Sequence, residues 1–317
     1  MFRHTQQTQY NCMPDKPDPL FAMKLQEILG GAYGEMTVAL QYLFQGWNTR
    51  VPGKYQDLIL DTATEELGHV EMICIMIARL LEGAPAEQTS AAAAANPALA
   101  AVLGGQNPQQ AIVSGGGAVP ADSAGYPWNG RFIVASGNLM ADFYANATAE
   151  MQGRLQVARI YNMTEDHGVR DMLRFNLARD TCHQNQWLAA IEQLREDGLE
   201  DVPVPIKFGL DEEYTEHSYE VWGLSDGVAS AEGRWASGPS FDGRGEFRYL
   251  DQPDPLGPLP ETAAADPLLY ATVDGGSRTA AGGTAPASGG GGLVDKAKEV
   301  ITGAAPGTHR DSGPDTD

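Results

Sequence analysis

The sequence predicts an all-α core, a four-helix bundle built from two helical hairpins. Four long segments within residues 1–200 repeat apolar residues at three- and four-residue spacing, which is typical of amphipathic helices. Short turns join the first segment to the second and the third to the fourth, whereas 83–130 separates the two pairs. Short turns favour antiparallel hairpins, and a long crossover between two hairpins is the ferritin-like arrangement.

Breaking residues set the ends of the four helices, which we expect at about 19–47, 55–82, 132–163 and 169–196. Pro52 and Gly53 end the first helix, and Gly83 with Pro85 ends the second. Thr164 is a candidate N-cap for the fourth helix, which ends at Gly198.

The remaining segments differ from the bundle in composition. The crossover is rich in Ala, Gly, Pro and Gln, and its Ala-rich part, 90–102, could form a short helix. Residues 201–273 combine frequent prolines with many aromatic residues, so we expect an extended, irregular arm that packs on the bundle or on a neighbouring subunit. Residues 274–317 are mostly Gly, Ala, Ser and Thr and predict a flexible tail.

Composition excludes several classes of protein. The net charge of −21 would repel a phosphate backbone, so we expect no nucleic-acid partner. No apolar run approaches the roughly 20 residues of a membrane span, and the N-terminus shows no secretory signal. Three cysteines, an odd number, provide no disulfide framework. We therefore expect a cytoplasmic protein with no membrane partner.

An internal repeat carries the candidate chemistry. Each hairpin offers a carboxylate on one helix and, 30 or 31 residues later, an acid-x-x-His on the next. The members are Glu35, Glu66 and His69 in the first hairpin and Glu150, Asp180 and His183 in the second. Residues three apart share a helix face, so both members of each acid-x-x-His can point into the bundle. Doubled in this way, the pattern is the ligand plan of dinuclear carboxylate sites, and it suits Mn or Fe. The plainer alternative is that the acids are solvent-exposed charges and that the two histidines only make ordinary hydrogen bonds.

The second half departs from this plan at Asp180, whose side chain is one methylene shorter than that of Glu. We expect it to fall short of the metals and leave three carboxylates and two imidazoles as ligands. Asp180 would then either accept protons beside the open metal positions or only orient a ligand through a hydrogen bond. Glu65 points about 100° away from Glu66 around the helix, so we expect it on the outer face or at a subunit contact.

Other polar residues share faces with the candidate ligands. Tyr42 lies two turns after Glu35 and could donate a hydrogen bond to a ligand carboxylate, or simply pack in the core. Arg154 lies four residues after Glu150 and could pair with it or with another inner carboxylate, or lie at the surface. Asn146 and Asn176, each four residues before an acid of the pattern, are similar candidates.

Several stretches resemble the manganese catalase family, which is non-haem, over roughly residues 1–250. They are MFRHTQQTQYN, EELGHVEM, GRLQVARIYNMTEDHGVRDML, ARDTCHQNQW and EGRWASGPS. The resemblance implies two manganese ions that cycle between +2 and +3 and convert the substrate hydrogen peroxide into water and dioxygen. It places the ligands at Glu35, Glu66, His69, Glu150 and His183. It also places an acid near the metals at Asp180, where some relatives have Glu. Some relatives carry Arg at the position of Ala149.

The same resemblance implies two further features. Some relatives bind structural calcium through two aspartates, matched here by Asp57 and Asp61, and through an arm loop that resembles Gly223-Leu-Ser225-Asp-Gly227. Backbone carbonyl ligation could survive the Gly in place of Asn, because calcium favours oxygen ligands. Solvent-exposed aspartates without calcium are the alternative. Relatives assemble as homo-hexamers, with the arm gripping a neighbour.

Two other functions remain open at the level of the sequence. A ferritin-like di-iron oxidase or iron-handling protein would use the same ligand types, although the long crossover and the arm argue against it. A structural, catalase-like coat protein is the second alternative. The presence of all five ligand positions argues against a purely structural role.

Overall fold

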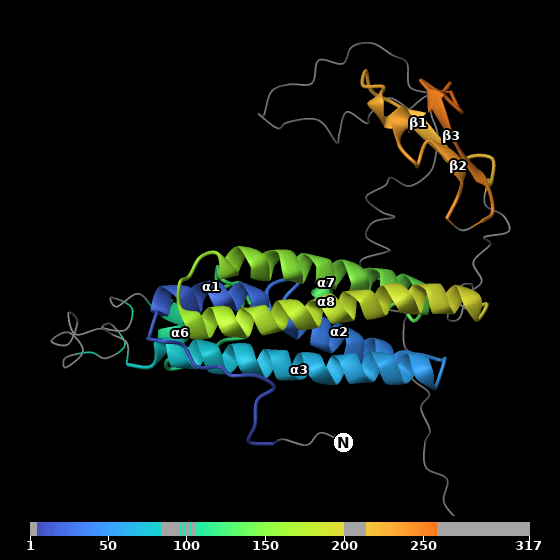
Figure 1. Cartoon of the computed structure of the whole chain (residues 1–317). Coiled ribbons are helices and arrows are strands. Elements are labelled where there is room, and N and C mark those ends of the chain that lie inside the picture. Colours follow the sequence, from blue (N-terminus) through green and yellow to red (C-terminus); the bar gives the residue numbers. More distant parts are fainter. Residues whose placement is uncertain are drawn as a thin grey trace, which may run out of the picture. The chain divides into compact units, whose positions relative to one another are not determined.

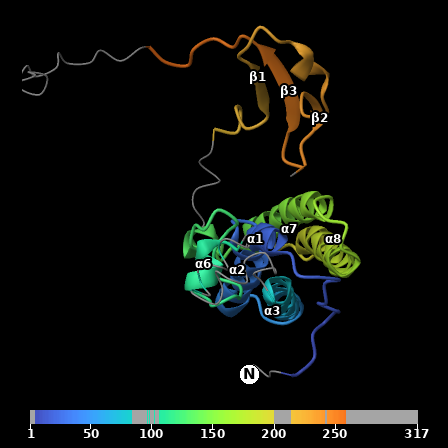
Figure 2. The same ribbon diagram turned by 90° about the vertical axis from the view of Figure 1, so that its left-hand side faces the viewer.

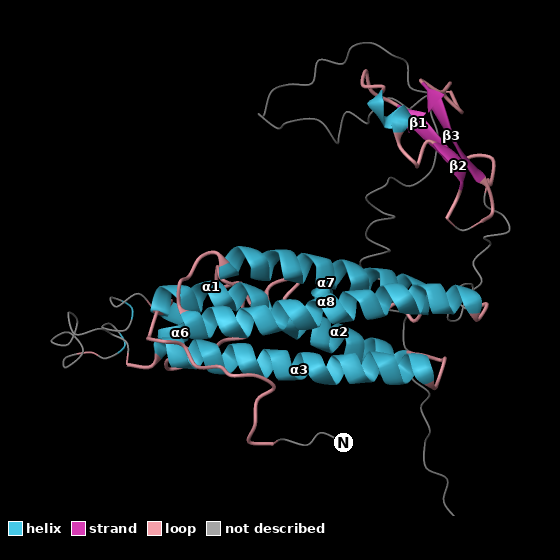
Figure 3. Cartoon of the chain, in the orientation of Figure 1, coloured by secondary structure: helices cyan, strands magenta, loops and turns pink. Residues whose placement is uncertain are grey.

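The computed structural model describes residues 5–83, 96, 98, 102, 106–199, 214–241 and 243–258. The chain divides into two compact units, Met1–Ser218 and Tyr219–Asp317. The first unit is a ferritin-like four-helix bundle, and Figures 1 and 3 show its long helices running side by side. In the described part of the chain, no helix is long and apolar enough to span a membrane.

Within the described residues, five longer helices and one short one belong to the first unit. They are α1 (Pro19–Gly30), α2 (Glu35–Asn48), α3 (Lys54–Leu81), α6 (Pro108–Ile112), α7 (Leu139–Tyr161) and α8 (His167–Glu196). The most extensive packing joins α2 to α3 and α7 to α8, the two hairpins that the short turns predicted. Figure 2 looks along the helix axes and shows α6 beside α1 and α2.

The first predicted helix, 19–47, is in fact two helices, and the prediction of one was wrong. The chain leaves helical geometry at Gly31, which is extended, and α2 begins after Gly34. At Gly30 the crossover comes so close that an added Cβ would lie 2.4 Å from the carbonyl oxygen of Ala121. The break makes Glu35 the first residue of α2, where the helix dipole favours a carboxylate.

The second hairpin also begins differently from the prediction. Helix α7 starts at Leu139 rather than near residue 132, because Asn138 caps it by accepting a hydrogen bond from the Ala141 amide. Helix α8 is capped by Asp166 and not by Thr164, since the Asp166 carboxylate accepts from the Val169 amide at 2.9 Å. A short 3₁₀ turn, η2 (Gly130–Phe132), precedes α7.

The crossover is fastened to α1 by one buried glutamine. Gln26 donates through Nε2 to the carbonyl oxygens of Val119 and Ala121, both at 2.7 Å, and its Oε1 accepts from the Val119 amide at 3.0 Å. This side chain provides a partner for the Val119 amide and the Ala121 carbonyl, and it shares the Val119 carbonyl with the Ala121 amide. The predicted Ala-rich helix at 90–102 lies almost entirely outside the described residues.

Two apolar clusters fill the bundle, one toward each end. One includes Leu25 of α1, Ile73 of α3 and Leu173 of α8. The other includes Phe143 of α7 and Trp187 of α8. The candidate ligands on α3 and α8 fall between these clusters in the sequence, so the bundle encloses a polar layer between two apolar ones.

The second unit contains a small sheet, which the sequence did not predict within the irregular arm. Its strands are β1 (Glu220–Gly223), β2 (Ser237–Pro239) and β3 (Glu246–Asp251), in the order β1-β3-β2. Strand β3 pairs in parallel with β1 and antiparallel with β2, and η4 (Ala229–Glu232) precedes β2. The packing of the arm on the bundle or a neighbour stays a prediction, and 274–317 lies outside the described residues.

Gln26 provides a test of how the crossover is held. Gln26→Ala would leave the Val119 amide and the Ala121 carbonyl short of partners, whereas the Val119 carbonyl keeps the Ala121 amide. Each unsatisfied group costs about 1–3 kcal/mol. We expect the free energy of unfolding, measured by urea denaturation, to fall by roughly 2–3 kcal/mol. Glu192→Ala, on the exposed face of α8, is the control and should change it by less than about 0.5 kcal/mol. An unchanged value for Gln26→Ala would contradict this account of the crossover.

Candidate metal centre

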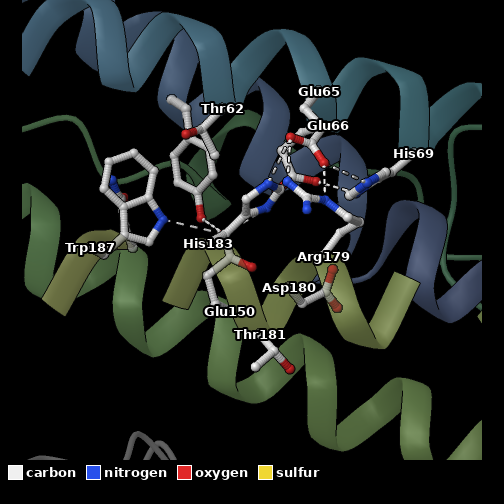
Figure 4. Close-up of polar contacts among 12 residues, drawn as sticks. Thr62, Glu65, Glu66, His69, Glu150, Arg179, Asp180, Thr181, His183 and Trp187 are labelled. Carbon is white, nitrogen blue, oxygen red and sulfur yellow. Dashed lines mark hydrogen bonds and ion pairs between the residues drawn. The ribbon is translucent and has the colours of Figure 1, made fainter. Parts of the chain in front are cut away.

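Four helices bring the predicted ligands together at the middle of the bundle. Helix α2 provides Glu35, α3 provides Glu66 and His69, α7 provides Glu150 and α8 provides His183. None of these residues is more than 5% exposed. Figure 4 shows His69 and Glu66 projecting from α3 toward His183 of α8 and Glu150 of α7.

The five side chains form two overlapping clusters that share Glu66. Glu35, Glu66 and His69 make the first, and Glu66, Glu150 and His183 make the second. Within each cluster the candidate ligand atoms lie within 4.8 Å of one another. Each cluster therefore offers two carboxylates and one imidazole, and Glu66 takes in the second cluster the place that the repeat assigned to Asp180.

The carboxylate of Glu66 faces both halves. Its Oε2 lies 2.7 Å from Nδ1 of His69, and its Oε1 lies 2.6 Å from Nδ1 of His183. Glu35 Oε2 lies 3.5 Å from Nδ1 of His69, and Glu150 Oε1 lies 3.9 Å from Nδ1 of His183. Both Nδ1 atoms thus point inward at carboxylates, and Glu66 stands where one carboxylate can bridge two cations.

Burial makes this centre unfavourable without cations. Burial, reinforced by the charge of Glu66, raises the pKa of Glu35 to about 7 and that of Glu150 to about 8. Glu66 is buried too, but the imidazoles of His69 and His183 outweigh burial and hold its pKa below the ordinary range. Several carboxylates in one dry site require compensating positive charge.

Unpartnered ligand atoms also fit a metal. Among the described residues, Glu66 Oε1 and His183 Nδ1 are buried without a hydrogen-bond partner, since their close contact lacks hydrogen-bond geometry. Burial lowers the pKa of His183, but its contacts with Glu65 and Glu66 outweigh this and raise it to about 10. A cation that binds Nδ1 would therefore displace a proton. Carboxylate oxygens and imidazole nitrogens suit Mn or Fe.

Two aromatic donors orient Glu150. Tyr42 is fully buried, and its hydroxyl donates to Glu150 Oε1 at 2.5 Å. Trp187 Nε1 donates to the same oxygen at 3.4 Å, and its ring contacts that of Tyr42. The hydrogen bond that the spacing of Tyr42 suggested is present, together with core packing. Sequence reasoning missed Trp187, although it lies four residues after His183 and shares its helix face.

Asn176 connects Asp180 to the first cluster. Its Nδ2 donates to Glu35 Oε1 at 2.8 Å and to Asp180 Oδ1 at 2.9 Å. Asp180 is buried but belongs to neither cluster of possible ligands within the described part of the chain. Burial and the nearby carboxylates, Glu35 first, raise its pKa well above the ordinary value. Asp180 is thus a buried acid next to the ligands and able to hold a proton.

Glu65 lies between α3 and α8 and not on the outer face, whereas the subunit contact that was the alternative stays a prediction. Its carboxylate accepts from Arg179 Nε at 2.5 Å and from Arg179 Nη2 at 3.1 Å. It also lies 3.2 Å from His183 Nε2, and its contacts with His183 and Arg179 lower its pKa to about 2. A step of 100° from Glu66 turns Glu65 onto the seam between α3 and α8 rather than into solvent.

Arg154 and Asn146 have other partners than the predicted ones. Arg154 donates to Gln184 Oε1 at 2.5 Å, across the seam between α7 and α8, and not to Glu150. The structure therefore does not bring Arg154 to the metal centre. Asn146 pairs with Gln41 and Gln45 of α2. Both side chains join helices instead of contacting a ligand.

The residues of the predicted calcium site belong to different units. Asp57 and Asp61 lie one turn apart on α3, and both are exposed. Gly223 ends β1, and Ser225 and Gly227 follow it in a loop where the Gly227 amide donates to Ser225 Oγ at 3.3 Å. Calcium binding at these residues stays a prediction.

Aromatic packing supports His69 from the outside. Phe175 of α8 packs edge-on against the His69 ring, with centroids 6.4 Å apart. Tyr10 of the N-terminal segment stacks on Phe175 at 4.6 Å and donates to Asp171 at 2.8 Å. The N-terminal segment thereby helps to fix a ligand far along the chain.

A four-helix bundle that encloses a doubled carboxylate–histidine cluster is the architecture of dinuclear metal proteins. Comparison with known proteins shows which family of this class the chain matches. A family model described as manganese containing catalase matches residues 1–282. The chain belongs to the manganese catalase family.

Individual relatives agree with this assignment. A manganese catalase from Bacillus subtilis (strain 168) is 55% identical over 275 residues, which cover 87% of this chain and 99% of that protein. A manganese catalase from Lactiplantibacillus plantarum is 43% identical over 272 residues, covering 85% and 98%. Among solved structures, KatB, a manganese catalase from Anabaena, matches with a TM-score of 0.62 and 25% identity, over 80% of this chain and 100% of that one.

Glu66 provides the test of the centre. Glu66→Ala removes the only side chain that belongs to both clusters in the described chain, so we expect both metals to be lost. Metal per chain, measured by plasma mass spectrometry after purification with manganese, should fall at least tenfold. Glu165→Ala, which removes an exposed carboxylate paired with Arg170, is the control and should retain metal. Full metal content in Glu66→Ala would contradict a shared bridging ligand.

Proposed function

We propose that this chain is a non-haem manganese catalase that converts two molecules of hydrogen peroxide into two of water and one of dioxygen. The observation that carries the proposal is the pair of buried clusters sharing Glu66, in a chain that belongs to the manganese catalase family. One ion would be held by Glu35, Glu66 and His69, and the other by Glu66, Glu150 and His183. When bound, the pair of ions supplies two-electron chemistry, alternating between +2 and +3.

The protein's own residues would manage protons and ligand orientation. Asp180 holds or accepts a proton next to the ligands, as general acid–base catalysis requires. Asn176 donates to both Asp180 and Glu35 and so keeps the two carboxyl groups at a fixed distance from each other. Tyr42 and Trp187 fix the oxygen of Glu150 that both contact. These contacts support a site held rigidly enough to use the same geometry in both half-reactions.

Burial of the site supports a small substrate. Because the ligands are nearly inaccessible, bulky reductants would be kept away from the centre. Hydrogen peroxide is small and neutral, so the net charge of −21 would not repel it. The same charge supports the absence of a nucleic-acid partner.

The proposal extends to assembly, location and a further cation. We propose a cytoplasmic homo-hexamer with two manganese ions in each subunit and one calcium ion at Asp57, Asp61 and the loop of the second unit. Exposed aromatic side chains on α2, Phe44 and Trp47, support a subunit interface on the bundle. The two adjacent exposed aspartates of α3 support cation binding.

Metal analysis and oxygen evolution together test the reaction. Protein purified from manganese-supplemented cells should contain about two Mn per chain and release dioxygen rapidly from peroxide, because a two-electron centre needs both ions. Bound iron with peroxide consumption and no dioxygen would favour a di-iron oxidase or iron-handling protein. Protein without metal or activity would favour a structural, coat-like role.

Asp180 separates proton transfer from metal binding. Asp180→Asn keeps the size of the side chain but cannot accept a proton, so we expect dioxygen evolution to fall by about 100-fold or more. Metal per chain should stay unchanged, since Asp180 lies outside both clusters. Glu192→Gln, on the exposed face of α8, is the control and should leave both quantities unchanged. Loss of metal from Asp180→Asn would mean that Asp180 is a ligand.

A further inference from the structure

The outer nitrogens of both candidate ligand histidines face one carboxylate. His183 Nε2 lies 3.2 Å from Glu65 Oε2, and His69 Nε2 lies 3.8 Å from Glu65 Oε1. The two imidazole rings are stacked, with centroids 5.7 Å apart and 25° between their planes. Figure 4 shows Glu65 next to Glu66 on α3, with Arg179 reaching it from α8.

No other hydrogen-bond acceptor competes for these nitrogens. Within the described chain, Nε2 of His69 and Nε2 of His183 are buried and lack a hydrogen-bond partner. Both nitrogens lie close to the Glu65 carboxylate, but the contacts do not have the geometry of a hydrogen bond. A small rotation of an imidazole or of the carboxylate would align donor and acceptor. Glu65 is thus the acceptor available to both rings.

Glu65 is itself held from two sides. Arg179 donates to both of its carboxylate oxygens, a bidentate arrangement that fixes the plane of the carboxylate. Gln9 of the N-terminal segment donates to the Glu65 carbonyl oxygen at 2.9 Å, and the absence of a side chain at Gly68 admits Gln9 there. Without Arg179, the partly exposed carboxylate of Glu65 would be free to turn toward solvent.

We propose that Glu65, clamped by Arg179, is the positioning residue for both histidine ligands of the dinuclear centre. A histidine that binds a metal through Nδ1 must carry its proton on Nε2, and an acceptor at Nε2 selects this tautomer and fixes the ring. Glu65 would do this for His69 and His183 together, so its loss would weaken both metal positions. The inference rests on the proposed metal centre.

The same helix provides a matched control for this pair. Arg170 of α8 and Glu165, which lies just before this helix, form another carboxylate–guanidinium contact, with Nη1 to Oε2 at 2.7 Å and Nη2 to Oε1 at 2.8 Å. Its guanidinium is partly buried like that of Arg179. The contacts of Glu165 do not include either ligand histidine, so Glu165→Gln removes a similar ion pair without touching the centre.

The test is a titration of metal-free protein with Mn²⁺ against a chelating indicator. Glu65→Gln should weaken the binding of both equivalents by about 10-fold, the lower end of the effect of outer carboxylates on metal affinity. Arg179→Gln should weaken both by a smaller factor, and Arg179→Lys, which keeps the charge, should recover part of the loss. Glu165→Gln should bind like the unsubstituted protein.

Thermal unfolding of the metal-free proteins separates positioning from stability. A positioning role predicts weaker Mn²⁺ binding in Glu65→Gln, with an unfolding midpoint close to that of Glu165→Gln. Unchanged affinity in Glu65→Gln, or loss at only one of the two equivalents, would overturn the inference and leave the proposed function intact. If Glu65→Gln does not fold, equal affinities for Arg179→Gln and the unsubstituted protein would overturn it. Failure of the unsubstituted protein to bind Mn²⁺ would overturn both proposals.

Discussion

Glu66 lies at the one place in the bundle where buried negative charge from three helices meets. Its two oxygens each face an imidazole, and Glu35 and Glu150 approach from opposite sides. Such a group of carboxylates is costly in a dry interior unless cations compensate it. The apolar clusters on either side of this layer stabilise the fold, whereas the polar layer requires metal.

The rest of the bundle can be understood as support for this layer. The break after Gly30 starts a new helix at Glu35, and the crossover that causes the close approach is held by Gln26. Around the ligands, donors from neighbouring helices reach two of the carboxylates: Asn176 at Glu35 and Tyr42 at Glu150. The second half of the repeat has Asp180 where the first half has Glu66. Asp180 lies beside the ligands and belongs to neither cluster.

The parts of this picture that depend on local spacing could be predicted from the sequence. An acid-x-x-His puts Glu66 and His69 on one face, and its repetition pointed to the five side chains that the structure brings together. Contacts between distant segments could not be predicted. The break between α1 and α2 depends on Ala121 of the crossover, and the position of Glu65 depends on how α3 packs against α8.

Long side chains and short strands were missed for similar reasons. Arg154 has several carboxylates within its reach, and only the packing of α7 on α8 directs it to Gln184. The sheet of the second unit has strands of three to six residues among prolines and glycines, too short to produce a clear alternation. Its pairing depends on residues far apart in the chain, such as Val221 and Tyr249.

The central claim is that two metal ions share Glu66. Anomalous diffraction at the manganese absorption edge, from crystals of the manganese-loaded protein, tests it most directly. The account predicts two peaks per chain, one on the His69 side of Glu66 and one on the His183 side, with one oxygen of Glu66 bound to each ion. A single peak, or two peaks of which only one contacts Glu66, would contradict it.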